Sequence, residues 1–287
     1  MSRTMPVITP RTVRTRRITF EYPPERLPRH YVSGDLVMSH VISVLSALFP
    51  EGEDFFVRTV RNYNAKITDP ELKSQVAGFI GQEVTHGREH RHFNERLAAM
   101  GYPTRATDRR TKRVLRLFEK VLPKRSQLAI TAALEHYTAT LAEVLLTDAR
   151  AQAMFDVDEV RSMLEWHALE ESEHKAVAFD VYQTVSGEHL RRIWVMRFVT
   201  VGFLFATISG TLMSLALDRA AYNPFRLFPS LWKLRRSPWL QPEVFRQIKD
   251  YNRPGFHPDD HDTNALVQEW KHRLFGADGA LAERMKA

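Results

Sequence analysis

Hydrophobic and polar residues follow one another along this chain with the spacing of α-helices almost from end to end. The pattern predicts a first helix over about residues 36–61, in which Pro50 marks a break or a fresh first turn. A second helix should have Asp69 as its N-cap, Pro70 at its first position and Gly101 just after its end. Few segments alternate with the period of a strand, so we expect an all-α fold.

Three more helices are predicted before residue 190. They cover about residues 108–121, 126–150 and 156–185, and the last of them should end at Gly187. Residues 11–21 alternate only weakly, and we expect them to form an extended arm that lies over the helices. Taken together, the long amphipathic helices predict a four-helix bundle.

An apolar stretch follows the bundle. Residues 199–217 carry no charge, and that length is enough to span a bilayer. Small residues recur in it at every fourth position, a ridge suited to close helix packing: Gly202, Ala206, Gly210 and Ser214. One interpretation is a helix buried across the bundle. The other is membrane contact, which the basic and aromatic segment that follows favours as an interfacial anchor.

The remaining residues predict a tail that wraps the outside of the bundle. A short helix is expected near residues 243–249, and a closing helix should run to Phe275. The His- and Asp-rich loop before that last helix is best explained as a turn with Asp262 or Thr263 as N-cap. The chain then divides into an arm (1–34), a di-metal bundle (35–187) and an apolar helix with its tail (188–287), which together form a single domain.

Composition narrows the chemistry. The 287 residues include no cysteine, which excludes disulfides, thiolate catalysis and thiolate-bound metals. The formal charge of +7 comes with no nucleic-acid-binding signature, so no nucleic-acid partner is expected. Arginines gather near the N-terminus, at Arg11, Arg14, Arg16 and Arg17, where a solvated face is the simplest interpretation.

The expected location is cytoplasmic. The first ten residues lack the apolar core of a secretory signal. Residues 193–240, which contain the apolar stretch and the basic aromatic segment, are the candidate for peripheral contact with the inner face of a membrane.

Four Glu-x-x-His motifs are present, where chance gives about one. They are Glu83/His86, Glu89/His92, Glu171/His174 and Glu269/His272. Two of them belong to a repeated unit, because each follows a helix with a Glu among apolar residues: Glu53 lies 30 residues before Glu83, and Glu135 lies 36 residues before Glu171. A Glu from each of two helices and Glu-x-x-His from the other two is the ligand arrangement of di-metal carboxylate bundles.

Electrostatics supports this interpretation. Four buried glutamates would repel one another and lose hydration, at a cost of about several kcal/mol each. Two divalent cations would neutralise them, and a mixed N/O shell suits iron or manganese better than structural zinc or magnesium. The alternative without a metal is that these Glu and His residues lie on the surface of long helices. It fits poorly with the positions of Glu53 and Glu135 in apolar stripes.

Four segments also resemble a known family. Residues 49–53, 81–86, 133–136 and 166–175 are similar to those of the bacterial predicted metal-dependent hydrolases of the ferritin-like superfamily. The resemblance covers about residues 10–275. It implies a ferritin-like four-helix bundle, here with an additional apolar helix and a C-terminal helical tail, and a metal site more firmly than any one reaction.

A second, local likeness concerns His167. Di-iron arylamine N-oxygenases carry an additional His four residues before the Glu of the last Glu-x-x-His, and His167 stands there relative to Glu171. This likeness implies seven metal ligands: Glu53, Glu83, His86, Glu135, His167, Glu171 and His174. The alternative for His167 is a hydrogen bond to a ligand carboxylate. His90, His136, Glu89 and Glu170 are expected to support the ligands or to lie at the surface.

The resulting expectation is a non-haem di-iron oxidase or oxygenase that activates O₂. Its cofactor would be two iron ions, with manganese or a mixed Mn/Fe pair as alternatives. Its partners would be a small hydrophobic or acyl substrate and a separate electron donor, and a homodimer is an open alternative to a monomer. The alternative reaction is hydrolysis by a metal-bound hydroxide at the same site. Iron storage is disfavoured, because a storage cage gives no reason for the apolar stretch.

Overall fold

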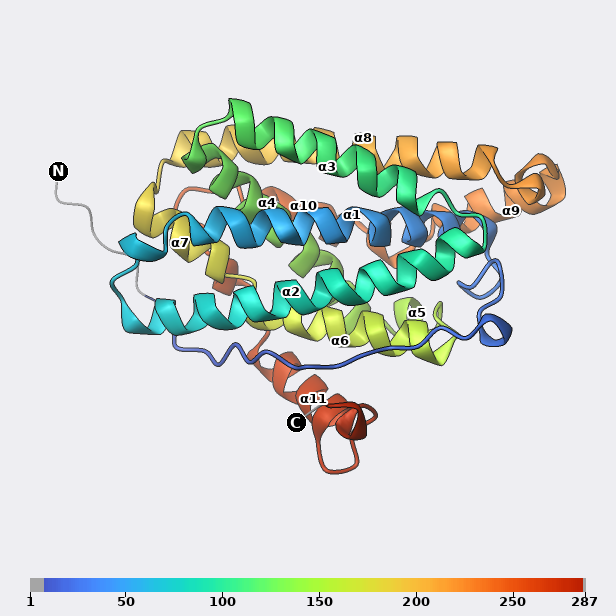
Figure 1. The fold of residues 1–287 in the computed structure, drawn as a ribbon, viewed down its shortest axis with the longest axis horizontal. Coiled ribbons are helices and arrows are strands. Elements are labelled where there is room, and N and C mark those ends of the chain that lie inside the picture. Colours follow the sequence, from blue (N-terminus) through green and yellow to red (C-terminus); the bar gives the residue numbers. More distant parts are fainter. Residues whose placement is uncertain (1–7, 286–287) are drawn as a thin grey trace.

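Four long helices form the centre of the molecule in the computed structural model, which describes residues 8–285. They pack in two pairs, α1 with α2 and α4 with α6 (Figure 1). No strand occurs within residues 8–285, so the expectation of an all-α helical bundle is confirmed. The helices are α1 (Leu36–Arg61), α2 (Pro70–Ala99), α3 (Thr104–Val121), α4 (Lys124–Thr147), α5 (Ala149–Gln152), α6 (Asp158–His174), α7 (Val177–Val185), α8 (His189–Ala216), α9 (Pro224–Leu234), α10 (Pro242–Asp250) and α11 (Asn264–Phe275).

The ends of α2 follow from local sequence. The side chain of Asp69 accepts a hydrogen bond of 2.8 Å from the backbone N–H of Leu72, as an N-cap does. At the other end Gly101 has a φ of +91°, the left-handed conformation that closes a helix and that glycine adopts without a Cβ penalty. Both predicted ends are confirmed.

Pro50 does not interrupt α1, so the predicted break is wrong. Proline cannot donate a hydrogen bond to the carbonyl one turn earlier, which belongs to Ser46. The Nδ2 of Asn94 on α2 donates to that carbonyl instead, at 2.9 Å. A neighbouring helix therefore satisfies the group that would otherwise be left without a partner.

Other predicted bounds need correction. α3 begins at Thr104, one turn before the expected start. α4 ends at Thr147 rather than near residue 150, because Asp148 accepts from the N–H of Arg150 and starts the short α5. The expected helix over 156–185 is two helices, since the chain turns at residues 175–176 so that α7 packs against α4 and α2.

The helix α8 lies lengthwise on α1 and α4 (Figure 1). In the described part of the chain it alone is long and apolar enough to cross a membrane, yet only 28% of its most apolar window is buried. The ridge of small residues is only partly used. A Cβ at Gly210 would lie 2.8 Å from Val44 of α1, whereas Gly202 faces open space. The interpretation of α8 as a helix buried across the bundle is therefore wrong for its outer face.

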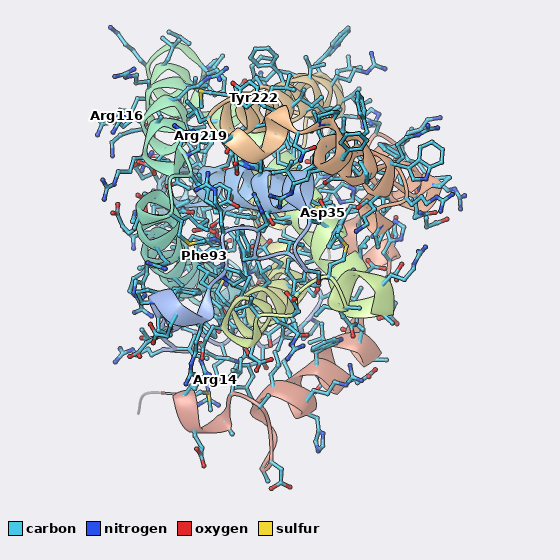
Figure 2. All side chains as sticks on the ribbon, turned by 90° about the vertical axis from the view of Figure 1, so that its right-hand side faces the viewer. Arg14, Asp35, Phe93, Arg116, Arg219 and Tyr222 are labelled. Atoms are coloured by element: carbon cyan, nitrogen blue, oxygen red, sulfur yellow. The ribbon has the colours of Figure 1, made fainter. Side chains whose placement is uncertain are left out.

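The arm and helix α11 cover the bundle on the side opposite α8 (Figure 1). Residues 8–23 form no helix and run along α2, so closely that a Cβ at Gly78 would overlap the carbonyl oxygen of Val13. Helix α11 packs on α6, and Asp262 accepts from the N–H of Asn264 at its start. Seen along the molecule, Phe93 lies inside the bundle whereas Arg116 points away from it (Figure 2). The division at residues 34 and 187 stays a prediction.

Candidate metal centre

The structure brings the seven predicted ligands together inside the bundle. All are buried, at no more than 4% exposed, and they come from α1 (Glu53), α2 (Glu83, His86), α4 (Glu135) and α6 (His167, Glu171, His174). The spacing explains the convergence, because residues three and four apart share one face of a helix. That each binds a metal stays a prediction.

One end of the cluster surrounds His174. Its Nε2 lies 3.2 Å from an oxygen of Glu83 and 3.2 Å from an oxygen of Glu135. The same nitrogen is 3.6 Å from Glu171. Ligand atoms of Glu83, Glu171 and His174 all lie within 4.8 Å of one another, which is close enough for one metal ion to contact all three.

The other end surrounds His86 and His167. The Nδ1 of His86 lies 3.6 Å from Glu83 and 3.7 Å from Glu171. The Nε2 of His167 is 2.9 Å from Glu171 and 3.8 Å from Glu53, and Glu53, His86 and His167 form a second group within 4.8 Å. Glu83 and Glu171 thus each approach histidines of both groups.

Buried polar atoms without hydrogen-bond partners are concentrated at this centre. Among the described residues, nine such side-chain atoms belong to it: both carboxylate oxygens of Glu53, Glu83 and Glu135, Oε2 of Glu171, Nδ1 of His86 and Nε2 of His174. A folded protein rarely leaves buried polar atoms unpaired, because each costs about 1–3 kcal/mol. Their chemistry, carboxylate oxygen and imidazole nitrogen, fits a pair of divalent cations.

The pKa values show how poorly the carboxylates fit the interior as bare charges. Burial and the neighbouring glutamates raise the pKa of Glu53 well above its usual range, and burial raises that of Glu83 despite the nearby His174. Burial and Glu83 raise the pKa of Glu135 to about 8. Burial also acts to raise the pKa of Glu171, but His174 and the hydrogen bond with His167 outweigh it and hold that pKa below the usual range.

Each of the three imidazoles is held by its other nitrogen. The Nε2 of His86 lies 3.0 Å from Glu170, Nδ1 of His167 lies 2.8 Å from His90, and Nδ1 of His174 lies 2.9 Å from Gln82. Such contacts fix the orientation of a metal-binding imidazole and leave the remaining nitrogen free for the metal. Each ring here therefore directs one nitrogen to the centre.

The sequence predicted a role for two of these three partners. Glu170 and His90 were expected either to support the ligands or to lie at the surface, and both are buried and contact ligand histidines. Gln82 was missed. Its position four residues before His86 puts it on the ligand face of α2, and this spacing was the available signal.

Arg16 corrects the interpretation of the N-terminal arginines as a solvated face. It is 7% exposed, and its guanidinium contacts Glu170 at 2.9 Å and Glu173 at 2.6 Å. Lys271 of α11 also reaches Glu173, at 3.0 Å. Since Glu170 holds His86, the arm is connected to the metal centre through one carboxylate.

A second group of metal-type side chains lies near the end of α8. His30 and His40 contact the same oxygen of Asp218, at 3.0 and 3.1 Å. Unlike the central cluster, these atoms are paired: Arg29 also contacts that oxygen, and Ser214 bonds the other nitrogen of His40. Burial lowers the pKa of His40 to about 4, so it stays neutral as a hydrogen-bond partner. The group is explained without a metal.

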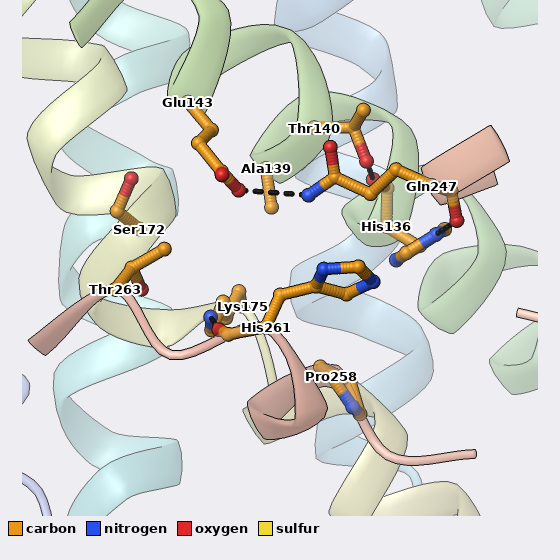
Figure 3. Close-up of a pocket in the computed structure, with 10 residues that line it drawn as sticks. All are labelled: His136, Ala139, Thr140, Glu143, Ser172, Lys175, Gln247, Pro258, His261 and Thr263. Carbon is orange, nitrogen blue, oxygen red and sulfur yellow. Dashed lines mark hydrogen bonds between the residues drawn. The ribbon is translucent and has the colours of Figure 1, made fainter. Parts of the chain in front are cut away.

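The cavity beside α4 is not a substrate site (Figure 3). Its volume of about 10 Å³ holds one water molecule at most. His136 bonds the carbonyl oxygen of Gln247 at 2.9 Å, and Lys175 donates to the carbonyl of His261. His136 therefore ties the tail to α4 rather than supporting a metal ligand.

Comparison with known proteins gives a single family. Searches among curated proteins and among solved structures found no match for the chain. A family described as "Predicted metal-dependent hydrolase" matches residues 14–262, a segment that contains most of the arm, the bundle, α8 and all seven residues of the centre. The chain therefore belongs to the family of predicted metal-dependent hydrolases.

Proposed function

We propose that this protein is a dinuclear metal enzyme and that its reaction is hydrolysis. One observation carries the proposal: nine unpaired carboxylate and imidazole atoms point to one place in the centre of the bundle. The family to which the chain belongs supports metal dependence and this class of reaction.

The seven residues divide naturally between two metals. Glu53, His86 and His167 would hold the first, and Glu135 and His174 the second. Glu83 and Glu171 would bridge the pair, since each approaches imidazoles of both groups. A bound metal pair would acidify a coordinated water and polarise the bond that the water attacks.

The chain's own side chains keep the centre dry and rigid. An aromatic ring packs against each of the three histidines. The distances between ring centroids are 4.8 Å for Phe49 and His167, 5.0 Å for Phe79 and His174, and 5.0 Å for Trp166 and His86. Gly87 adds room, because a Cβ there would lie 3.1 Å from Glu53. Removal of bulk water strengthens every electrostatic interaction in the site.

Iron is the metal that we propose for this centre, with manganese or a mixed Mn/Fe pair as the other candidates. The set holds four carboxylates and three imidazoles and no thiolate, a combination that suits these ions. Metal analysis of anaerobically purified protein identifies the native ions and should find about two per chain.

A second candidate function is oxidation with O₂ by a di-iron centre. The observation that favours it is the set of two Glu-x-x-His pairs and two further glutamates in a helical bundle, with His167 as an additional nitrogen ligand. This function would require a separate electron donor. In both cases we propose a small hydrophobic or acyl substrate, because apolar α8 lies against the α4 helix that carries Glu135.

One pair of assays separates the two functions. Under argon, protein loaded with manganese or zinc should hydrolyse chromogenic esters or phosphodiesters if the reaction is hydrolysis. Protein loaded with Fe(II) should instead consume O₂ with no such turnover if it is oxidation. The variant Glu135→Ala should abolish whichever activity is found, and Glu143→Ala on the same helix should keep it. Activity that survives Glu135→Ala would end both proposals.

A further inference from the structure

An exposed apolar stripe runs the whole length of α8 and continues onto α9. At 100° per residue, Trp194, Val201, Phe205 and Leu212 fall within about 20° of one line along the helix. Each is well exposed, with Val201 at 70% and Trp194 at 65%. On α9, Phe225 is 88% exposed and Trp232 is 54% exposed. We call these six residues the apolar face; soluble monomers rarely expose continuous apolar surfaces of this kind.

The apolar face carries basic residues and almost no acidic ones around it. Residues 189–242 include eight Arg or Lys side chains but one acidic residue, Asp218, which is buried. Beside Trp232, the guanidinium of Arg235 lies 4.9 Å from the ring and that of Arg236 lies 5.4 Å from it. The rim of α9 is therefore cationic next to its aromatic side chains.

The basic helix α3 forms the other edge. It lies alongside α8, where the Arg110 guanidinium is 5.5 Å from the Phe205 ring and Phe118 packs at 5.5 Å from Phe198. Arg113 and Arg116 on its outer side are exposed, and Arg116 points away from the bundle (Figure 2). The apolar face thus has basic side chains along its α3 edge and around Trp232 on α9.

Three occupants could cover such a face, and charge decides among them. A second copy of the chain would bring basic margins against basic margins, which costs free energy. A spanning arrangement would pull α8 away from α1 and α4, against which Met196, Val199 and Leu215 are buried. An anionic lipid surface suits both the apolar face and the basic residues around it. Apolar side chains can be buried below the lipid head groups, and arginine side chains can pair with the anionic head groups themselves.

We propose that the apolar face and its basic margins dock on an anionic membrane surface, with α8 lying flat along it. Helices α1 and α4, which carry Glu53 and Glu135 of the metal centre, then lie directly beneath α8. In this orientation both α8 and α9 contact the membrane surface, since α9 continues from the end of α8 (Figure 1).

Vesicle binding tests this directly. Full-length protein should co-sediment with vesicles of phosphatidylcholine and phosphatidylglycerol and much less with phosphatidylcholine alone. Binding should weaken at about 1 M salt, where the screening length falls to about 3 Å. Lipids brominated along the acyl chain should quench the fluorescence of exposed Trp194 and Trp232. A Trp194→Phe/Trp232→Phe variant should lose most of that quenching, because Trp166 and Trp270 are buried and half-buried Trp239 is held against α4 by its hydrogen bond to the carbonyl of Leu141.

Matched variants separate the apolar and the charged contributions. Phe225→Ser/Trp232→Ser should lower the partition coefficient by about tenfold or more, since each exposed ring contributes to burial in lipid. The control is Val84→Ser on α2, which is similarly exposed at 52%. Arg235→Glu/Arg236→Glu should also lower binding by about tenfold or more. Its control is Arg61→Glu/Lys73→Glu, the same change of charge at the last residue of α1 and in the first turn of α2, two helix ends that lie far from α9 (Figure 1).

Three results would overturn the proposal. The first is equal binding to neutral and anionic vesicles, and the second is no binding to either. The third is a dimer in sedimentation equilibrium that buries Trp194 and does not bind vesicles. The variants change exposed side chains, and unchanged helical content and metal content show that each is folded. A folded variant that still binds like the unaltered chain contradicts the assignment of its residue to the docking surface.

Discussion

At the scale of single residues, Glu135 tests the metal centre most directly. It is the one carboxylate that α4 contributes, and its oxygen lies 3.2 Å from Nε2 of His174. We expect Glu135→Ala to lose about half of the bound metal or more, because removal of one ligand opens the shell. Elemental analysis of purified protein measures this. Glu143→Ala, two turns along the same helix, should keep its metal, and full occupancy in both variants would contradict the ligand role.

Gln82 tests whether the imidazoles are held for the metal. Its Oε1 bonds Nδ1 of His174 and its Nε2 lies 2.8 Å from Glu173. Gln82→Leu should weaken metal binding by about 10- to 100-fold, the range found when such supporting contacts are removed. Competition with a coloured chelator measures the affinity.

The control for that change is Gln75→Leu, two turns earlier on α2. Gln75 is also buried but bonds Glu71 and the carbonyl of Thr9, away from the centre. It should alter stability without altering metal affinity. Equal loss of affinity in the two variants would mean that a general loosening of α2, and not His174, is responsible.

At the scale of elements, the arm is fastened through Arg16. This side chain is buried between Glu170 and Glu173, and removal of one partner from a buried ion pair leaves uncompensated charge. Arg16→Met should lower the free energy of unfolding by about 3–5 kcal/mol, measured by urea denaturation of the metal-loaded protein. Metal affinity should fall too, because Glu170 holds His86.

Arg17→Met is the matched control for the arm. Arg17 neighbours Arg16 in sequence but is exposed, so its loss should change the unfolding free energy by less than about 1 kcal/mol. If both variants unfold alike, the arm is not attached through the carboxylates of α6.

At the scale of the whole molecule, metal and protons compete for the same carboxylates. The pKa of Glu135 is raised from 4.5 to about 8, so without metal the folded protein binds more protons than the unfolded chain over that interval. The lowered pKa values of His40, His136 and His167 oppose this effect only below pH 6.5, so stability of chelator-treated protein should decrease as the pH rises from 6.5 to about 8. The raised pKa values of Glu53, Glu83 and His174 act in the same direction.

The metal-loaded protein should lack this decline, because cations replace the protons and stabilise the folded state by mass action. Thermal unfolding with and without a chelator, across that pH range, measures the difference. A melting temperature of the chelated protein that rises steadily with pH would show that the buried carboxylates do not control its stability.

Local chemistry determined much of this protein from sequence alone. Asp69 and Gly101 end α2 through contacts made within one turn, and the spacing of Glu83 from His86 or of His167 from Glu171 places them on one helix face whatever surrounds that helix. Helical periodicity predicted the all-α fold, whereas the family was predicted from the resemblance of four segments to its members. The ferritin-like relationship, the domain division and the metal-binding role of the seven residues stay predictions.

Tertiary structure decided what depends on distant partners. Pro50 stays inside α1 because Asn94 on another helix bonds the carbonyl of Ser46, and Arg16 is buried because carboxylates more than 150 residues away surround it. The same apolar composition allowed α8 to be buried or exposed, and only its packing on α1 and α4 showed which face remains open. A sequence specifies contacts along one helix through its period, whereas contacts between helices depend on how those helices are placed in space.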